Sequence, residues 1–161
     1  MASNELLGVY LNDHLAGATA GLELAEKLRD NNQGTELGKV MAALHHDIDQ
    51  DRAALEEVMA RLEVDRHPVK EAAGWMLERL SRLRLNPLLT GSADLTRLLE
   101  TEALSLGIEG KLGMWLALKE AAAANPRLAG TDFDRLIERA GSQRQALEPH
   151  RVAAALHSFS A

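Results

Sequence analysis

Six ionisable side chains occupy positions where the helical periodicity of the sequence requires apolar residues: His14, Asp51, Glu102, Glu109, Arg144 and Arg151. Glu102 and Glu109 are seven residues apart, and so are the two arginines. This spacing places both members of a pair on one helix face, two turns apart. Carboxylate and imidazole groups bind iron or manganese, whereas arginine and carboxylate groups form bidentate ion pairs. The sequence therefore allows either a metal site or an ion-pair network inside a bundle of helices.

In a metal site, the ligands of iron or manganese would be His14, Asp51, Glu102 and Glu109. The arginines argue against this site, because they would repel a cation on the same faces. In the other interpretation, Arg144 and Arg151 neutralise the two glutamates, and a protonated His14 neutralises Asp51. We therefore expect a structural polar network in the core. A metal site, and a small anion held by the arginines, stay open as alternatives.

The elements that must position these residues are helices. Turn-forming residues divide the chain into five predicted helical segments, at residues 4–32, 35–63, 68–86, 94–124 and from 131 onward. Thr35 is a suitable N-cap for the second segment, and a sequence resembling a capping box starts the fifth at residues 131–134. Aromatic and β-branched residues are sparse, and no segment shows the alternation of a strand. The chain is therefore predicted to be all-α.

The fourth predicted helix is apolar on two sides. The stripe that we expect to face the core carries Glu102 and Glu109 between the residues Leu95, Leu98, Leu106, Gly113 and Leu116. The second stripe consists of Leu104, Ile108, Trp115 and Leu118. A helix that is apolar on both sides is usually covered on both, so this second stripe predicts contact with the 68–86 segment or with a second copy. We expect a homo-oligomer, such as a dimer formed through these four residues.

The segment lengths also predict a topology. The first two long helices form one antiparallel hairpin, and the last two form another. The 30 residues Val64 to Ala93 join the hairpins, and they are long enough to return along the whole bundle. This arrangement, a single domain over residues 1–161, resembles the ferritin-like four-helix bundle superfamily.

That resemblance implies a di-metal oxidoreductase centre in the bundle core. Its ligands would be one Glu from each of two helices and a Glu-x-x-His motif from each of the other two. In this chain the residues three positions before His45, His46 and His150 are not glutamate but Ala42, Ala43 and Leu147. The resemblance therefore implies the fold and transfers no ligand positions.

Composition narrows the functional classes. The 161 residues carry 18 basic and 24 acidic side chains, a net charge of −6, which argues against a general nucleic-acid binder. The absence of cysteine excludes disulfides and thiol catalysis. Residues 1–12 lack the basic start of a secretory signal, and no apolar stretch is long enough to span a membrane, so we expect a cytoplasmic protein.

These observations favour a non-catalytic helical-bundle protein with a buried charged network that self-associates. Two alternatives remain from the sequence. One is a divergent ferritin-like metal-binding protein or di-metal oxidoreductase, and the other is a bundle that binds a small ligand between its helices.

Overall fold

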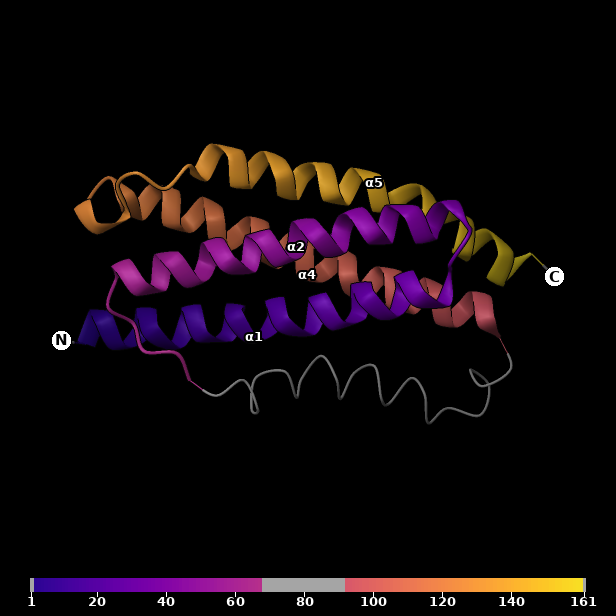
Figure 1. Cartoon of the computed structure of the whole chain (residues 1–161), viewed down its shortest axis with the longest axis horizontal. Helices are drawn as coiled ribbons and strands as arrows, with labels where there is room; N and C mark the ends of the chain where they lie inside the picture. Colours follow the sequence, from indigo (N-terminus) through magenta and orange to yellow (C-terminus); the bar gives the residue numbers. More distant parts are fainter. Residues whose placement is uncertain (1, 68–91, 161) are drawn as a thin grey trace.

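The computed structural model describes residues 2–67 and 92–160, with side chains from residue 5 onward. Within these ranges the chain forms a bundle of four long helices, α1 (Ala2–Asn31), α2 (Glu36–Arg61), α4 (Ala93–Ala122) and α5 (Phe133–Phe159), and one short 3-10 helix, η1 (Pro126–Leu128) (Figure 1). The predicted all-α four-helix bundle is confirmed. The predicted short helix at 68–86 lies outside the described residues.

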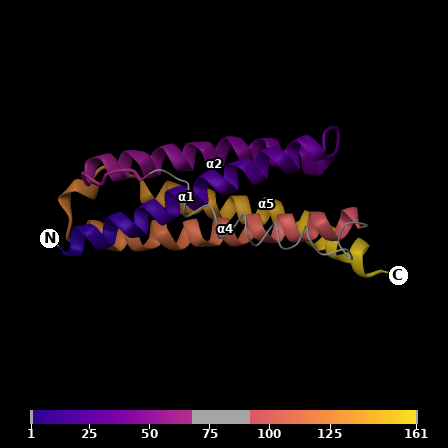
Figure 2. The same ribbon diagram turned by 90° about the horizontal axis from the view of Figure 1, so that it is seen from below.

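The four helices form two antiparallel hairpins, α1 with α2 and α4 with α5. The end of α2 and the start of α4 lie at opposite ends of the bundle, so these two helices run in the same direction (Figure 1). Figure 2 shows α1 crossing the bundle obliquely, from α4 at its N-terminus towards α2. The hairpins are joined where α1 packs on α4 and where α2 packs on α5.

Side chains cap the starts of three of the long helices. The Thr35 hydroxyl accepts a hydrogen bond from the Gly38 amide at 3.1 Å, which confirms the predicted cap of α2. Ser92 caps α4 through the Leu95 amide in the same way. The cap of α5 is Asp132, one residue later than the first residue of the predicted capping box. Polar residues at the turns therefore fix where these helices begin.

Gly38 lies in the first turn of α2, where the chain folds back from α1. A Cβ atom here would lie 2.1 Å from the carbonyl oxygen of Asn32, which also accepts a hydrogen bond from the Thr35 hydroxyl at 2.7 Å. We therefore expect Gly38→Ala to lower the free energy of unfolding by about 1–3 kcal/mol, although alanine is the better helix former. Gly141→Ala in α5 is the matched control, because its Cβ would meet no atom within 4 Å, and it should stabilise the fold by about 0.5–1 kcal/mol. Urea unfolding followed by circular dichroism measures both, and equal effects would contradict the close approach at Gly38.

The buried apolar side chains form two clusters. The first lies towards the α4–α5 connection and includes Leu11, Leu15, Leu55, Val58, Met59, Leu62, Met114, Trp115, Leu118, Leu128, Phe133 and Leu136. The second lies towards the α1–α2 turn and includes Leu24, Ala25, Leu28, Leu37, Met41, Leu44, Ile48, Leu104, Ile108, Ala140 and Leu147. All four helices contribute to both clusters, which hold the two hairpins together.

The inward stripe of α4 is not the one that the sequence favoured. The stripe predicted for a dimer is buried inside the chain, with exposures of at most 2% for Leu104, Ile108, Trp115 and Leu118. Two residues of the stripe predicted for the core, Leu106 and Leu116, are instead 59% and 47% exposed. The face predicted for dimer contact is therefore wrong, because the bundle itself covers the stripe that contains the large Trp115 side chain.

Candidate functional site

Asp51 of α2 is the most deeply buried charged side chain in the described part of the chain, with 1% of its side chain exposed. Its Oδ1 atom accepts a hydrogen bond from Nε of Arg139 in α5 at 2.7 Å, and Nη2 of the same guanidinium also contacts this oxygen. Its Oδ2 atom accepts from Nζ of Lys111 in α4 at 2.5 Å and from Nε2 of Gln143 in α5 at 2.9 Å. Donors from two other helices thus surround the carboxylate.

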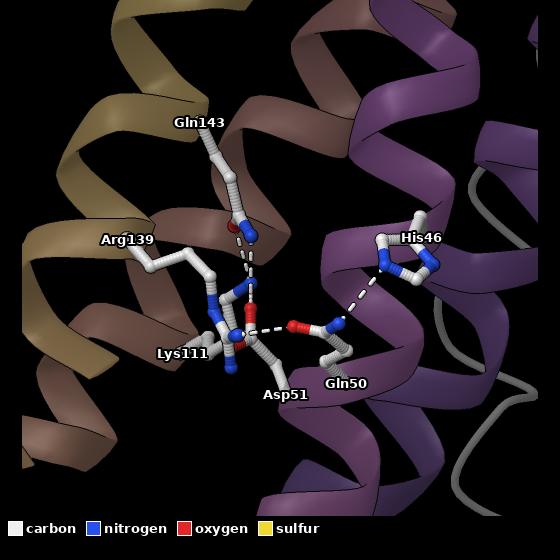
Figure 3. Close-up of polar contacts among 6 residues, drawn as sticks. All are labelled: His46, Gln50, Asp51, Lys111, Arg139 and Gln143. Carbon is white, nitrogen blue, oxygen red and sulfur yellow. Dashed lines mark hydrogen bonds and ion pairs between the residues drawn. The ribbon is translucent and has the colours of Figure 1, made fainter. Parts of the chain in front are cut away.

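The other members of the site bond to one another as well (Figure 3). The Gln143 Oε1 atom accepts a second hydrogen bond from Lys111 Nζ, at 2.5 Å. On the outer side, Nη1 of Arg139 donates to Oε1 of Gln50 at 2.7 Å, and Nε2 of Gln50 lies 2.9 Å from Nε2 of His46. We call Asp51, Lys111, Arg139 and Gln143 the charged layer. Gln50 and His46, which are exposed, continue it to the surface of α2.

The charged layer separates the two apolar clusters. On α2, Asp51 stands between Ile48 of the second cluster and Leu55 of the first. On α5, Arg139 stands between Leu136 of the first cluster and Ala140 of the second, and Gln143 follows between Ala140 and Leu147. The carboxylate comes from the α1–α2 hairpin, and all of its donors come from the α4–α5 hairpin. The layer is therefore a polar joint between the two hairpins, set between two apolar contacts.

The layer combines one carboxylate with two cationic groups in a poorly hydrated place. Burial lowers the pKa of the Lys111 ammonium, and the negative charge of Asp51 opposes that shift. Each oxygen of Asp51 already accepts two contacts, so all of the roughly four lone-pair positions of the carboxylate are used. Such a group is fixed in position and has no free lone pair for a substrate or a metal ion.

The glutamates and arginines that the sequence placed in the core lie elsewhere. Glu109 Oε2 and Arg144 Nη1 are 2.7 Å apart, with side chains that are 55% and 47% exposed. Glu102 Oε1 lies 3.3 Å from Nη1 of Arg151, whose pKa is raised chiefly by its hydrogen bonds to Glu148 on its own helix. Both pairs line the outer seam between α4 and α5. Their predicted core position is wrong, because α4 turns the stripe with its two glutamates away from the core.

His14 does not belong to the charged layer either. Its ring contacts the ring of Tyr10 edge-on, with centroids 4.6 Å apart. Burial lowers the pKa of His14 below its ordinary value of 6.5, and the charge of Asp13 only partly offsets this. The neutral form is thus favoured in the folded chain. The prediction that a protonated His14 balances Asp51 is wrong, since Lys111 and Arg139 provide the positive charge.

The lowered pKa of His14 makes stability depend on pH. The unfolded chain binds this proton more tightly, so His14 contributes its full stability above pH 6.5, and that contribution is lost as the pH falls through the lower pKa of the folded state. We expect the free energy of unfolding, measured in urea at about pH 7.5 and about pH 5, to fall less in His14→Gln than in the wild type. His157→Gln, at an exposed histidine of α5, is the control. An unchanged pH slope in His14→Gln would contradict the prediction.

The metal hypothesis does not fit these residues. In the described ranges, no three His, Asp or Glu side chains converge so that they could hold a metal ion. The predicted ligands are dispersed: Glu102 and Glu109 face the outer seam, His14 packs against Tyr10, and the oxygens of Asp51 are occupied. The set predicted for iron or manganese is therefore not assembled.

The sequence interpretation missed three members of the charged layer, Lys111, Arg139 and Gln143, although two of them left a signal. Gln143 lies on the apolar stripe of α5, at helical spacing from Ala140 and Leu147, but it carries no charge. Lys111 stands between Ile108 and Trp115 on the stripe of α4 that had been assigned to the outside. A long side chain can start at the edge of an apolar stripe and still reach a buried carboxylate. A search for polar side chains on either stripe would have found both residues.

Fold and site together define a four-helix bundle with a buried charged layer between its two hairpins. No protein-family model matches the chain, and no curated protein or solved structure matches it. Among the described residues, no helix combines the length and the apolar character needed to cross a membrane. Function is therefore inferred from the geometry of the charged layer and of the molecular surface.

Proposed function

We propose that this chain is a non-catalytic, self-associating helical-bundle protein in which the charged layer fixes how the two hairpins pair. The observation that carries the proposal is the saturation of Asp51, whose two oxygens are held by Lys111, Arg139 and Gln143. A reactive carboxylate needs an open position next to the reacting atom. A structural one needs partners that satisfy it completely, as here.

The layer can specify register because a wrong pairing would leave charges unpaired in the core. If α5 slid by one helical turn along α2, Asp51 would keep only one of its two α5 donors, and Leu136 or Leu147 would come close to the place of the other. An uncompensated buried charge costs several kcal/mol, whereas two apolar faces can slide with little loss. Buried polar residues fix register in some helical assemblies for this reason.

The proposal also covers the topology of the bundle, the location of the protein in the cell and its role in interactions. We propose a ferritin-like topology, which is supported by two antiparallel hairpins whose α2 and α4 run in the same direction (Figure 1). We also propose a cytoplasmic location, in keeping with a cysteine-free sequence. A role as an interaction protein suits a bundle with exposed apolar residues and a saturated interior.

The test of the register function replaces the whole layer by apolar residues, Asp51→Leu, Lys111→Met, Arg139→Met and Gln143→Leu together. We expect this variant to be at least as stable as the wild type, since no charge is left unpaired. We also expect doubled or broadened amide signals in its NMR spectrum, because the hairpins pair in more than one register. A single sharp set of signals would show that the layer does not specify pairing and would overturn this function.

A further inference from the structure

The outer side of the charged layer is a short chain of hydrogen bonds that reaches solvent on α2 (Figure 3). Asp51 holds Arg139 through Nε and Nη2, which leaves Nη1 of the guanidinium for another partner. This nitrogen donates to Oε1 of Gln50 at 2.7 Å, and Nε2 of Gln50 lies 2.9 Å from Nε2 of His46. An exposed histidine is therefore linked to the buried carboxylate through Gln50 and Arg139.

The donors of this chain can point in one direction only. The guanidinium of Arg139 has N–H donors and no acceptor, and it does not lose its proton in proteins. Its Nη1 therefore takes the oxygen of the Gln50 amide, and the NH2 group of that amide faces His46. Nε2 of His46 must then accept, which requires a neutral imidazole with its proton on Nδ1. The arginine thus selects the protonation state and the tautomer of the histidine.

A proton on Nε2 of His46 is incompatible with this arrangement. Both ring nitrogens of an imidazolium are donors, so the NH2 group of Gln50 would face an N–H group. If the Gln50 amide turns over to accept from His46, its NH2 group faces Nη1 of Arg139, and two donors oppose each other there. If the imidazolium instead turns into solvent, the Gln50 amide loses the acceptor that orients it. Either change weakens the contact on the outer side of Arg139.

His46 titrates in a charged neighbourhood, so the groups around it need to be named. Histidine ordinarily gains its proton between pH 8 and pH 5, whereas carboxylates and guanidinium groups ordinarily keep their charges over this range. His150 is the other histidine on the side of α5 that carries Arg139, eleven residues or about 16 Å further along the helix. The charged and titratable side chains around His46 and Gln50 are Asp47 and Asp49 on α2, Arg135, Arg139 and His150 on α5, and Lys111 on α4 behind the layer.

We infer that His46, Gln50 and Arg139 form a proton-sensitive latch on the charged layer. The latch is closed when neutral His46 accepts from Gln50 and the Gln50 oxygen accepts from Arg139. It opens when His46 takes up a proton from solvent, because the two ends of the Gln50 amide can no longer both be satisfied. The inference adds control by pH to the joint between the hairpins, and it rests on the Gln50 contacts and not on the proposed register function.

NMR signals of the histidine ring nitrogens in the full chain at about pH 8 test the closed state. His46 should carry its proton on Nδ1 and have an unprotonated Nε2. Gln50→Ala removes the donor and should return His46 to a mixture of tautomers like that of His157, which is exposed on α5 and serves as the internal reference. A wild type with the His46 proton on Nε2 would overturn the latch, because Gln50 would then have to turn its oxygen away from Arg139.

The NMR signal of the Arg139 Nε–H group tests whether the proton on His46 acts through Gln50. Between about pH 8 and about pH 5 this signal should shift in the wild type with the same midpoint as the His46 ring. His46→Gln keeps an acceptor for Gln50 but does not titrate, so the shift should be lost. Gln50→Ala should also abolish the shift, although His46 still titrates.

His150→Gln is the matched control and should leave the Arg139 shift unchanged. A shift that persists in Gln50→Ala, or one that disappears in His150→Gln, would overturn transmission through the amide. Circular dichroism checks that each variant is folded. An Arg139 signal that does not respond to pH in the wild type would overturn the latch and leave the register function in place, because the spectrum of the apolar variant of the whole layer decides that function independently.

Discussion

Asp51→Leu is expected to lower the free energy of unfolding by about 3–5 kcal/mol, a large part of the stability of a typical domain. The substitution removes the only carboxylate that contacts Lys111 and Arg139 within the layer. These cations are held by the packing of α4 and α5, with side chains that are 12% and 16% exposed. They cannot return to water without opening the joint between the hairpins, so the loss exceeds that of an exposed ion pair.

The same variant should recover part of its stability at high pH. Burial already lowers the pKa of Lys111 from its ordinary value of 10.5, and removal of Asp51 removes the main opposing charge. The unfolded chain then holds this proton more tightly than the folded one. Folding is therefore favoured increasingly as the pH rises towards 10.5, where the unfolded lysine also loses its proton.

Urea unfolding at about pH 7 and about pH 10, followed by circular dichroism, measures both effects. Asp49→Leu is the control, because Asp49 is an exposed carboxylate on the same helix that pairs with Arg52, one turn away. It should change the free energy of unfolding by no more than about 0.5 kcal/mol. A cost at Asp51 as small as that at Asp49 would contradict the assignment of the layer as a hairpin joint.

The helices and their ends could be predicted from the sequence, because local chemistry determines them. Thr35 caps α2 through a hydrogen bond to a residue three positions away, and this depends on neighbours in the sequence alone. The apolar stripe of α2 was also predicted with Asp51 inside it, since that helix has one apolar face. Where a helix has only one apolar face, the spacing of its apolar residues is sufficient to predict which side is buried.

The orientation of α4 could not be predicted in this way, because two of its sides are apolar. Periodicity alone does not distinguish a stripe with Leu106 and Leu116 from one with Ile108 and Trp115. The choice depends on the shapes of the other helices, which bury the tryptophan completely. If the side with Leu106 and Leu116 is expected to face the core, the two glutamates of α4 are placed inside the bundle and Lys111 is placed outside it. One rotation of one helix thus accounts for the errors at Glu102, Glu109 and Lys111.

Trp115→Ala is expected to lower the free energy of unfolding by about 3–5 kcal/mol, for a reason unrelated to charge. The indole is fully buried in the first apolar cluster, where it lies beside Phe133 of α5 with ring centroids 6.3 Å apart. Leu11 and Leu15 of α1 belong to the same cluster. Truncation would therefore leave a cavity where three helices meet, and rigid neighbours cannot fill it.

Trp115→Phe distinguishes the contribution of the aromatic ring to stability from that of the indole N–H group. The indole Nε1 is buried and has no hydrogen-bond acceptor among the described residues, so the folded chain pays a desolvation cost for this N–H group. Phenylalanine keeps an aromatic ring and removes the unpaired donor, and we expect less than half the loss caused by alanine. Urea unfolding followed by circular dichroism is the suitable measurement, because the substitution alters tryptophan fluorescence itself. Equal losses for phenylalanine and alanine would contradict this prediction. They would mean that the indole N–H group makes a stabilising contact, and that filling the space with an aromatic ring is not what stabilises the first apolar cluster.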